Sequence, residues 1–242
     1  MPSVSDLSND AGFVFQANVE QLGASSARGF TPSGETAVVL ITRIVKSPAA
    51  LAGYQGQRIT VELQPPVSLQ AGQSAVFFTH GIHYGESVVV RELGNAPPEA
   101  TMDAQVSSAT QAYRDTALTQ RMAQADLILT GVASASGQYL ETTAALAGRR
   151  VSEHDPQWWQ SVITIGSVEK GSHAGGTKSI LFPHSTDIAW YSSPKVKEGD
   201  RGVWLLHLRD LRGRATPSHA LIHPLDFQPF DQVEHVRSLM KK

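Results

Sequence analysis

The stretch EGDRGVWLLH (residues 198–207) decides the fold, because it repeats the pattern of AGQSAVFFTH (residues 71–80). Both stretches read as a glycine turn followed by an apolar strand that ends in histidine. A second pair lies upstream in the same order. There, TAVVLITRIVK (36–46) parallels QSVITIGSVEK (160–170), and a lysine closes each run before a turn. Two matching elements in the same order predict a chain that contains two copies of one fold.

Each copy is predicted to have five strands, because runs rich in β-branched and aromatic residues alternate with Gly, Pro, Asn and Ser. These runs lie at 12–20, 36–46, 57–63, 73–80 and 87–93 in the first copy, and at 125–134, 160–170, 177–183, 201–208 and 218–224 in the second. Five strands are too few for an immunoglobulin-type sandwich, which needs about seven. They suit a five-stranded Greek-key barrel of the OB type.

One helix is predicted after each set of strands. The first helix would have an apolar face made of Met102, Val106, Ala109, Tyr113 and Ala117, with Thr101 as its N-cap. The second would use Phe230, Val233, Val236, Leu239 and Met240, with Asp231 near its positive start. The predicted fold class is mainly β, with two tandem five-stranded OB-like Greek-key barrels, each followed by one α-helix. The predicted domains are an N-terminal barrel (1–100), a linking helix (101–124) and a C-terminal barrel with its terminal helix (125–242).

The composition of the 242 residues excludes several classes of protein. The chain has no cysteine, which rules out disulfides, thiolate zinc sites, iron–sulfur clusters and a cysteine nucleophile. Its formal net charge is −2, without the basic excess of a domain that binds duplex nucleic acid. No apolar run reaches the roughly 18 residues that span a bilayer. The first residues, MPSVSD, resemble no signal peptide, so we favour the cytoplasm.

Several short motifs resemble those of a known group of proteins. They are the V-x-K-G strand end at 168–171, the GVWLLH strand at 202–207, HDPQW at 154–158 and DIAWYSSPK at 187–195. The chain is similar in these motifs to uncharacterised bacterial tandem OB-like β-barrel proteins, which are related to TIMP/netrin-type modules. The resemblance implies a fold and no activity. TIMP-type protease inhibition places an N-terminal cysteine on the catalytic zinc, and this chain has no cysteine.

The second copy carries the residues that we predict to make contacts. Its first two strands are separated by a loop at 135–159, which is far longer than usual and so favours a function. Tryptophan and tyrosine are favoured interface anchors. The leading hypothesis is a non-enzymatic protein that binds a protein partner or assembles with itself through aromatic loops. The predicted contact residues are Trp158, Trp159, Trp190 and Tyr191, with Asp155 and Lys195 as polar orienters.

A second hypothesis is that the second barrel binds single-stranded nucleic acid. In OB barrels the loops between strands 1–2 and 4–5 flank the binding face. Here these loops would supply Trp158 and Trp159 for base stacking, and Arg209, Arg212 and Arg214 for phosphates. The competing interpretation is that the tryptophans plug the barrel and the arginines are solvated. Exposed rings beside arginines favour nucleic acid, whereas exposed rings without nearby charge favour a protein.

A third hypothesis is a metal-dependent hydrolase with His154, His184 and Asp187 around the metal. Zinc needs three or four ligands, and these residues would have to converge through tertiary structure. The chain has no G-x-S-x-G elbow, no Walker A loop and no dinucleotide fingerprint, so we expect neither an enzyme nor a cofactor. His80 and His207 hold equivalent places in the repeat, which favours a structural role for both.

Overall fold

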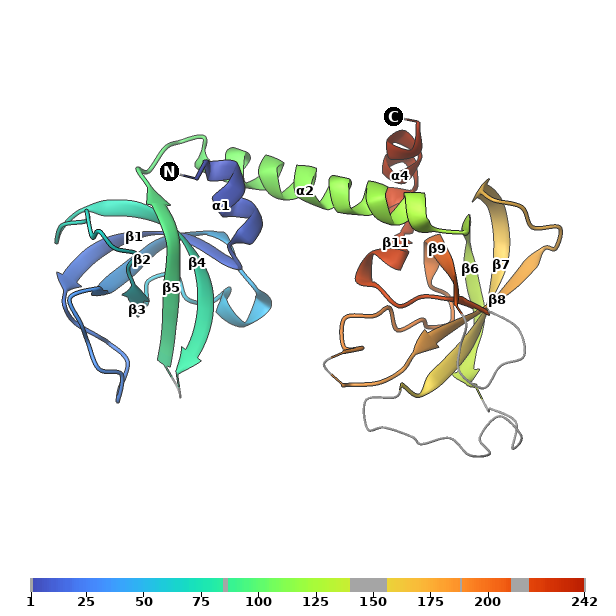
Figure 1. The fold of residues 1–242 in the computed structure, drawn as a ribbon, viewed down its shortest axis with the longest axis horizontal. Helices are drawn as coiled ribbons and strands as arrows, with labels where there is room; N and C mark the ends of the chain where they lie inside the picture. Colours follow the sequence, from blue (N-terminus) through green and yellow to red (C-terminus); the bar gives the residue numbers. More distant parts are fainter. Residues whose placement is uncertain (1, 85–86, 140–155, 188, 210–217, 242) are drawn as a thin grey trace. The chain divides into compact units, whose positions relative to one another are not determined.

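The computed structural model describes residues 2–84, 87–139, 156–187, 189–209 and 218–241. By their contacts the residues separate into two compact units, Met1–Arg114 and Asp115–Lys242. Each unit contains a barrel of five strands, so the predicted fold class is confirmed (Figure 1). The finer division into residues 1–100, 101–124 and 125–242 stays a prediction. In the described part of the chain, no helix combines the length and the apolar character needed to span a membrane.

The first unit is a closed barrel with the strand order β1-β2-β3-β5-β4. Its elements are α1 (Val4–Asp10), β1 (Phe13–Leu22), β2 (Thr36–Lys46), the 3-10 turn η1 (Ala49–Leu51), β3 (Arg58–Glu62), β4 (Ser74–Tyr84) and β5 (Ser87–Ala96). Strands β3 and β5 pair in parallel, and the other pairs are antiparallel. This is the pairing expected of a five-stranded OB-type Greek key.

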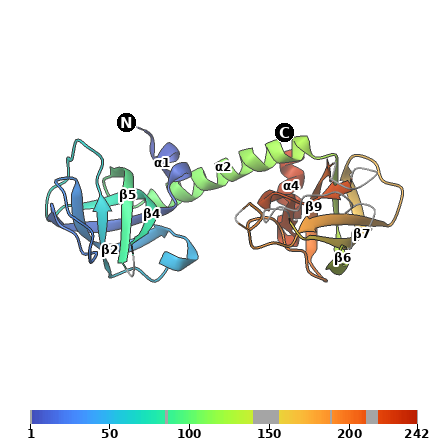
Figure 2. The ribbon, with the colours of Figure 1, turned by 60° about the horizontal axis from the view of Figure 1, so that its bottom comes forward.

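Alternation along the strands fills the first barrel. Phe13 and Phe15 are two residues apart on β1 and therefore share a face. Phe15 stacks on Phe77 of β4 with ring centroids 5.6 Å apart, and all three rings are buried. Helix α1, which the sequence patterns did not predict, lies beside β4 and β5 in both views (Figures 1 and 2). A capping box between Ser3 and Asp6 starts this short helix.

The second unit repeats the barrel with a different closure. Its elements are β6 (Leu127–Gln138), β7 (Trp158–Lys170), β8 (Thr177–Pro183), β9 (Arg201–Arg209), β10 (Ser218–Ala220), η2 (Pro224–Asp226), β11 (Phe227–Pro229), η3 (Phe230–Gln232) and α4 (Val233–Met240). The order β10-β8-β7-β6-β9 closes because β10 also pairs with β9. The strand predicted at 218–224 is wrong beyond Ala220, since Pro224 begins η2. The additional strand β11 pairs with β9.

Helix α2 (Met102–Gln124) contributes one end to each unit. Met102 and Val106 pack in the apolar cluster that covers the outside of β1 and β4. Leu118 and Met122 pack with β6, β9 and α4 in the second unit. The predicted single apolar face is wrong in the middle of the helix, where Tyr113 is 59% exposed. The reason is that each half of the helix serves a different core.

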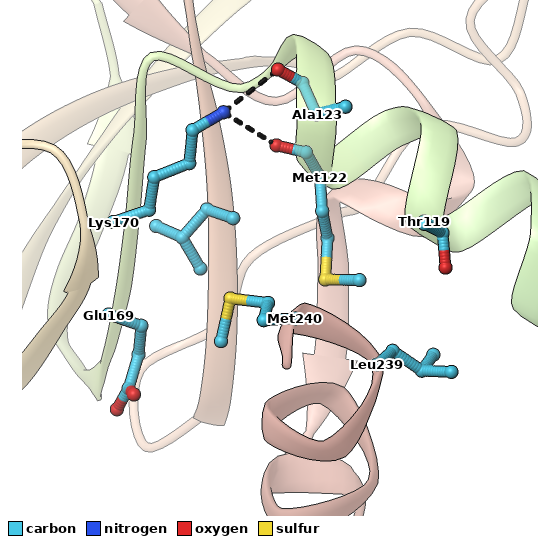
Figure 3. Close-up of a pocket in the computed structure, with 8 residues that line it drawn as sticks. Thr119, Met122, Ala123, Glu169, Lys170, Leu239 and Met240 are labelled. Carbon is cyan, nitrogen blue, oxygen red and sulfur yellow. Dashed lines mark hydrogen bonds between the residues drawn. The ribbon is translucent and has the colours of Figure 1, made fainter. Parts of the chain in front are cut away.

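Lys170 fixes the C-terminal end of α2 to the second barrel. Its ammonium group donates hydrogen bonds to the carbonyls of Met122 and Ala123, at 2.9 and 2.8 Å (Figure 3). These carbonyls belong to the last turn of the helix, where that of Met122 otherwise accepts only a long bond from the N–H of Ala125, at 3.3 Å. An apolar hollow of about 330 Å³ remains beside this contact, between α2 and the end of α4. Met122 and Met240 line it (Figure 3).

A buried ion pair fixes the same helix to the segment that follows β10. Arg121 donates two hydrogen bonds to the carboxylate of Asp226, at 2.6 and 2.9 Å. The backbone N–H groups of Ile222 and His223 also donate to Asp226. Burial would raise the pKa of this carboxyl, but His207, Arg121 and the two N–H groups outweigh it and lower the pKa to about 2. The group is therefore a buried, fully paired anion.

Candidate aromatic contact site

The two adjacent tryptophans at the start of β7 point to opposite sides of the barrel wall. Successive side chains of a strand alternate between its two faces. Trp159 lies opposite Phe182 of β8 and packs against the barrel core. Its ring also stacks on that of His184, with centroids 4.2 Å apart. Trp158 faces outward, where its ring meets Trp190 in an edge-on contact with centroids 6.1 Å apart.

Trp190 and Tyr191 lie in the loop between β8 and β9, residues 184–200, drawn in orange (Figure 1). Lys195 holds this loop to the barrel. Its ammonium group donates to the carbonyl of Pro183 at 2.6 Å and to that of Trp190 at 2.8 Å. Burial lowers the pKa of Lys195, and the two carbonyls compensate for its lost hydration. The predicted polar orienter therefore contacts the backbone that carries Trp190.

Further hydrogen bonds make the turn around Tyr191 rigid. The N–H of Ser193 donates to the carbonyl of Trp190, and the Ser193 hydroxyl donates to the carbonyl of Ile222, at 2.9 Å. On the other side, the Asp187 carboxylate accepts from the N–H of Ala189. Val196 anchors the loop in the core. A loop held at this many points loses little freedom when a partner binds.

Exposure distinguishes the three aromatic residues of this surface. The side chain of Tyr191 is 74% exposed, whereas Trp158 and Trp190 are partly buried against each other. We call Trp158, Trp190 and Tyr191 the aromatic patch. The two tryptophans form a supported base, and the tyrosine projects beside it. Large apolar side chains that are held rigidly at the surface are typical of contact sites.

Among the described residues, the patch has little charge available to a ligand. Lys195 uses its ammonium group on two carbonyls, and Asp187 caps a backbone N–H. Arg209 is exposed, but it lies opposite Ser218 at the start of β10. The patch is anchored to Ile222, beyond the other end of β10. The structure therefore does not bring Arg209 to the aromatic patch.

Several predicted residues lie outside the described part of the chain. They are His154 and Asp155 in the first long loop, and Arg212 and Arg214 between β9 and β10. His184 and Asp187 are described, yet the described residues contain no group of three His, Asp or Glu side chains that could hold a metal ion. The proposed metal site stays a prediction, because its third ligand, His154, lies outside the described residues.

The two equivalent histidines have different environments. His80 is exposed on β4, whereas His207 is buried on β9. Nε2 of His207 lies 3.3 Å from the Asp226 carboxylate, outside hydrogen-bond geometry, so we regard this contact as electrostatic. Neither Asp226 nor Arg121 was predicted from the sequence as a functional or structural group. The two residues are 105 positions apart, and no local pattern joins them.

The comparisons with known proteins add little to this description. No protein-family model and no curated protein matches the chain. A solved structure of the single-stranded DNA binding protein from Thermus aquaticus aligns with 90% of this chain and 91% of that chain, at 12% identity. The TM-score is 0.18, which is too low to carry an argument about function. The fold therefore defines a tandem OB-like barrel protein, and the TIMP/netrin-type relationship stays a prediction.

Proposed function

We propose that this chain is a non-enzymatic binding protein whose second barrel contacts a protein partner, or a second copy of the chain, through the aromatic patch. The single observation that carries the proposal is the 74% exposed ring of Tyr191 on a loop held by Lys195 and Ser193. The ring lies outside the apolar clusters that the described residues of the second unit form. Its exposure costs free energy in water, which a partner would recover by covering it.

The charge around the patch supports a protein partner over a phosphate-rich one. The nearest described cation, Lys195, already donates to two carbonyls. The rings of Trp158 and Trp190 offer apolar area, and Tyr191 adds a polar tip. This combination is typical of protein interfaces. Trp159 would act from beneath, because it packs on the core and supports His184.

Site-specific photocrosslinking tests the proposal. A photoreactive phenylalanine derivative at position 191 should give a discrete crosslinked product in cells, identified by mass spectrometry. The same group at position 113 should give none, since Tyr113 is a matched exposed tyrosine outside the patch. Trp190→Ala should abolish the product from position 191. Identical products from positions 191 and 113 would contradict the proposal.

Self-association is tested separately by light scattering across a range of concentrations. If the partner is a second copy, the wild-type mass should rise with concentration and Tyr191→Ala should stay monomeric. The Tyr113→Ala control should behave like wild type. A concentration-independent monomer would leave the heterologous partner as the occupant of the patch.

Single-stranded nucleic acid is the second candidate ligand of the same barrel. The observation that favours it is the OB-type strand order with the outward ring of Trp158 on β7, although the exposed Arg209 on β9 lies away from that ring. Fluorescence anisotropy with an oligo(dT) strand tests it. Binding should weaken steeply with salt and should fall in the Trp158→Ala variant. Binding that is absent or independent of salt would remove this candidate.

A further inference from the structure

A second, separate hollow lies in the wall of the second barrel. It has a volume of about 180 Å³ and lies between β8 and the start of β10. Strand β10 has only three residues and pairs with β8 at a single position, Ala220 opposite Leu181. Among the described residues the two strands have no pairing before that position, and the hollow lies there.

The polar side chains that line this hollow are suited to bind an anion. They are the ammonium group of Lys178, the imidazole of His219, the hydroxyls of Ser179 and Ser218, and the amide of Gln160. Each of these groups is able to donate a hydrogen bond. No carboxylate is among the described residues of the lining. The remaining lining residues, Ile180 and Leu181, are apolar.

Lys178 differs from the other partly buried cations of the second unit. Arg121 binds Asp226, Arg237 binds Glu169, and the Lys170 and Lys195 ammonium groups each donate to two carbonyls. Among the described residues, Lys178 has no hydrogen bond or ion pair. Burial lowers its pKa. A partly desolvated cation without a partner is unfavourable, and an incoming anion relieves that cost.

His219 adds an imidazole whose protonation responds to the charge of Lys178. Burial lowers its pKa most, and the positive charge of Lys178 lowers it further. His173 and His207 act in the same direction, whereas Asp126 raises the pKa. The Asp126 carboxylate accepts a hydrogen bond from the N–H of Leu208, at 2.6 Å. Among the described residues, Lys178 and Asp126 therefore act on His219 in opposite directions, and the two histidines add to the effect of Lys178 when they are protonated.

We propose that the hollow between β8 and β10 binds the phosphate or sulfate group of a ligand, held by Lys178 and His219. Gln160 and Ser179 also line the hollow, and the Gln160 amide donates to the Ser179 hydroxyl at 3.4 Å. The phosphate group belongs either to a small phosphorylated molecule or to the backbone of a single strand. This site shares no residue with the aromatic patch, so its test does not depend on the protein-partner proposal.

The proposal includes a coupling between the anion and the His219 proton. A bound dianion stabilises the imidazolium and therefore raises the pKa of His219. By the reverse linkage, the affinity for the anion increases as the pH falls through that pKa. Sulfate is the appropriate probe, because its own charge does not change near neutral pH.

Sulfate titration of the full chain, observed by NMR of the histidine rings, tests the site. His219→Gln identifies the His219 signal by its loss. Sulfate should move this signal saturably and raise the pKa of His219, whereas chloride at the same ionic strength should not. Lys178→Gln should weaken sulfate binding about tenfold or more, the loss expected for one charge-assisted hydrogen bond. Lys197→Gln is the matched control, because Lys197 is exposed in the same unit.

Two results would overturn the proposal. One is an equal response of His219 to chloride and sulfate, and the other is unchanged sulfate affinity in a folded Lys178→Gln protein. The wild-type titration needs no variant, so a misfolded Lys178→Gln protein does not block the test. Titration with inorganic phosphate and with oligo(dT) separates the two sources. A response to phosphate alone assigns a small ligand, and a Lys178-dependent response to the strand assigns the nucleic acid backbone.

Discussion

The two barrels share one strand order, but the strand that closes each barrel differs between them. Lys46 lies opposite Val14 in the first barrel, and Lys170 lies opposite Ile128 in the second. Each lysine caps the helix that precedes its barrel, since Lys46 donates to the Ser8 carbonyl of α1 and Lys170 to the last turn of α2. The repeated unit is therefore a helix, a lysine cap and a barrel.

The fifth strand is where the two copies differ most. In the first barrel β5 has ten residues and a long ladder with β4. In the second barrel β10 has three residues, and the buried Asp226 holds the segment that follows it. A backbone ladder in one copy is thus replaced by a side-chain ion pair in the other. Backbone pairing resists single substitutions, so we expect the second copy to be the more easily broken.

The loops after the third strand show a related difference. In the first barrel this loop buries Leu63 and Leu69 in the core. In the second barrel the corresponding loop buries Val196 and leaves Tyr191 at the surface. The first loop serves the fold, whereas the described part of the second loop places one apolar side chain in the core and presents a ring to solvent. The candidate site therefore lies in the second barrel, whose loop after the third strand exposes an aromatic ring.

Among these predictions, removing the Asp226 carboxylate should lower the free energy of unfolding most. Asp226→Ala leaves Arg121, which is 12% exposed, without its partner, and it also orphans two N–H groups. Breaking a buried pair in this way costs about 3–5 kcal/mol. Urea unfolding followed by tryptophan fluorescence measures this cost in the second unit, because all four tryptophans lie there. Glu234→Ala, in an exposed pair of the same unit, should change little.

The same carboxylate should make the second barrel sensitive to acid. The pKa of Asp226 in the folded chain is about 2, below the ordinary value of 3.8, so the unfolded chain takes up the proton first. Its contribution of about 2 kcal/mol is complete well above pH 3.8 and is lost as the pH falls toward 2. Tryptophan fluorescence between pH 5 and 2 checks this. The Asp226→Asn variant should lack that part of the pH dependence, and an unchanged profile would contradict it.

A substitution at Gly202 tests the additional strand β11, which pairs with β9 of the second barrel. Gly202 lies where the repeat places Ala75 in the first barrel. A Cβ at Gly202 would collide with the carbonyl of Gln228 and approach the Phe227 ring to 2.9 Å. Gly202→Ala should therefore detach β11 and cost about 1–3 kcal/mol, measured by the same urea unfolding.

The reciprocal change in the first barrel provides the control for β11. Ala75→Gly meets no such strand, and its cost should stay below about 1 kcal/mol, read from amide exchange in β4. Tolerance of Gly202→Ala without loss of stability would show that β11 does not pack on β9 in solution.

Local sequence patterns predicted most of the strands of the two barrels. The strand at 177–183 and the strand at 36–46 were predicted with the observed ends, because β-branched runs end there at turn residues. Helix α1 was missed, since seven residues are too few to establish a helical period. The strand at 218–224 was too long because the analysis did not apply the rule against proline within a central strand to Pro224.

The candidate site was predictable only in part. Both tryptophans at 158 and 159 were chosen as contacts, although strand alternation sends only one of them outward. Alternation alone could have separated them. The role of Lys195 and the exposure of Tyr191 depend on how a 17-residue loop folds back, which no periodicity encodes. Lys178 and His219 lie on separate strands, and only the short β10 creates the hollow between them.

The smallest effect should come from the lysine caps that the barrels share, and this effect tests whether they are truly equivalent. Lys170→Met keeps the apolar stem and removes the hydrogen bonds to Met122 and Ala123, so it should cost about 1 kcal/mol in the second unit. Lys46→Met should cost a similar amount in the first unit through α1. Tryptophan fluorescence reports the former, and amide exchange in α1 and β1 reports the latter. A loss confined to one variant would mean that the two lysines match in sequence and register, but that only one of them stabilises its helix.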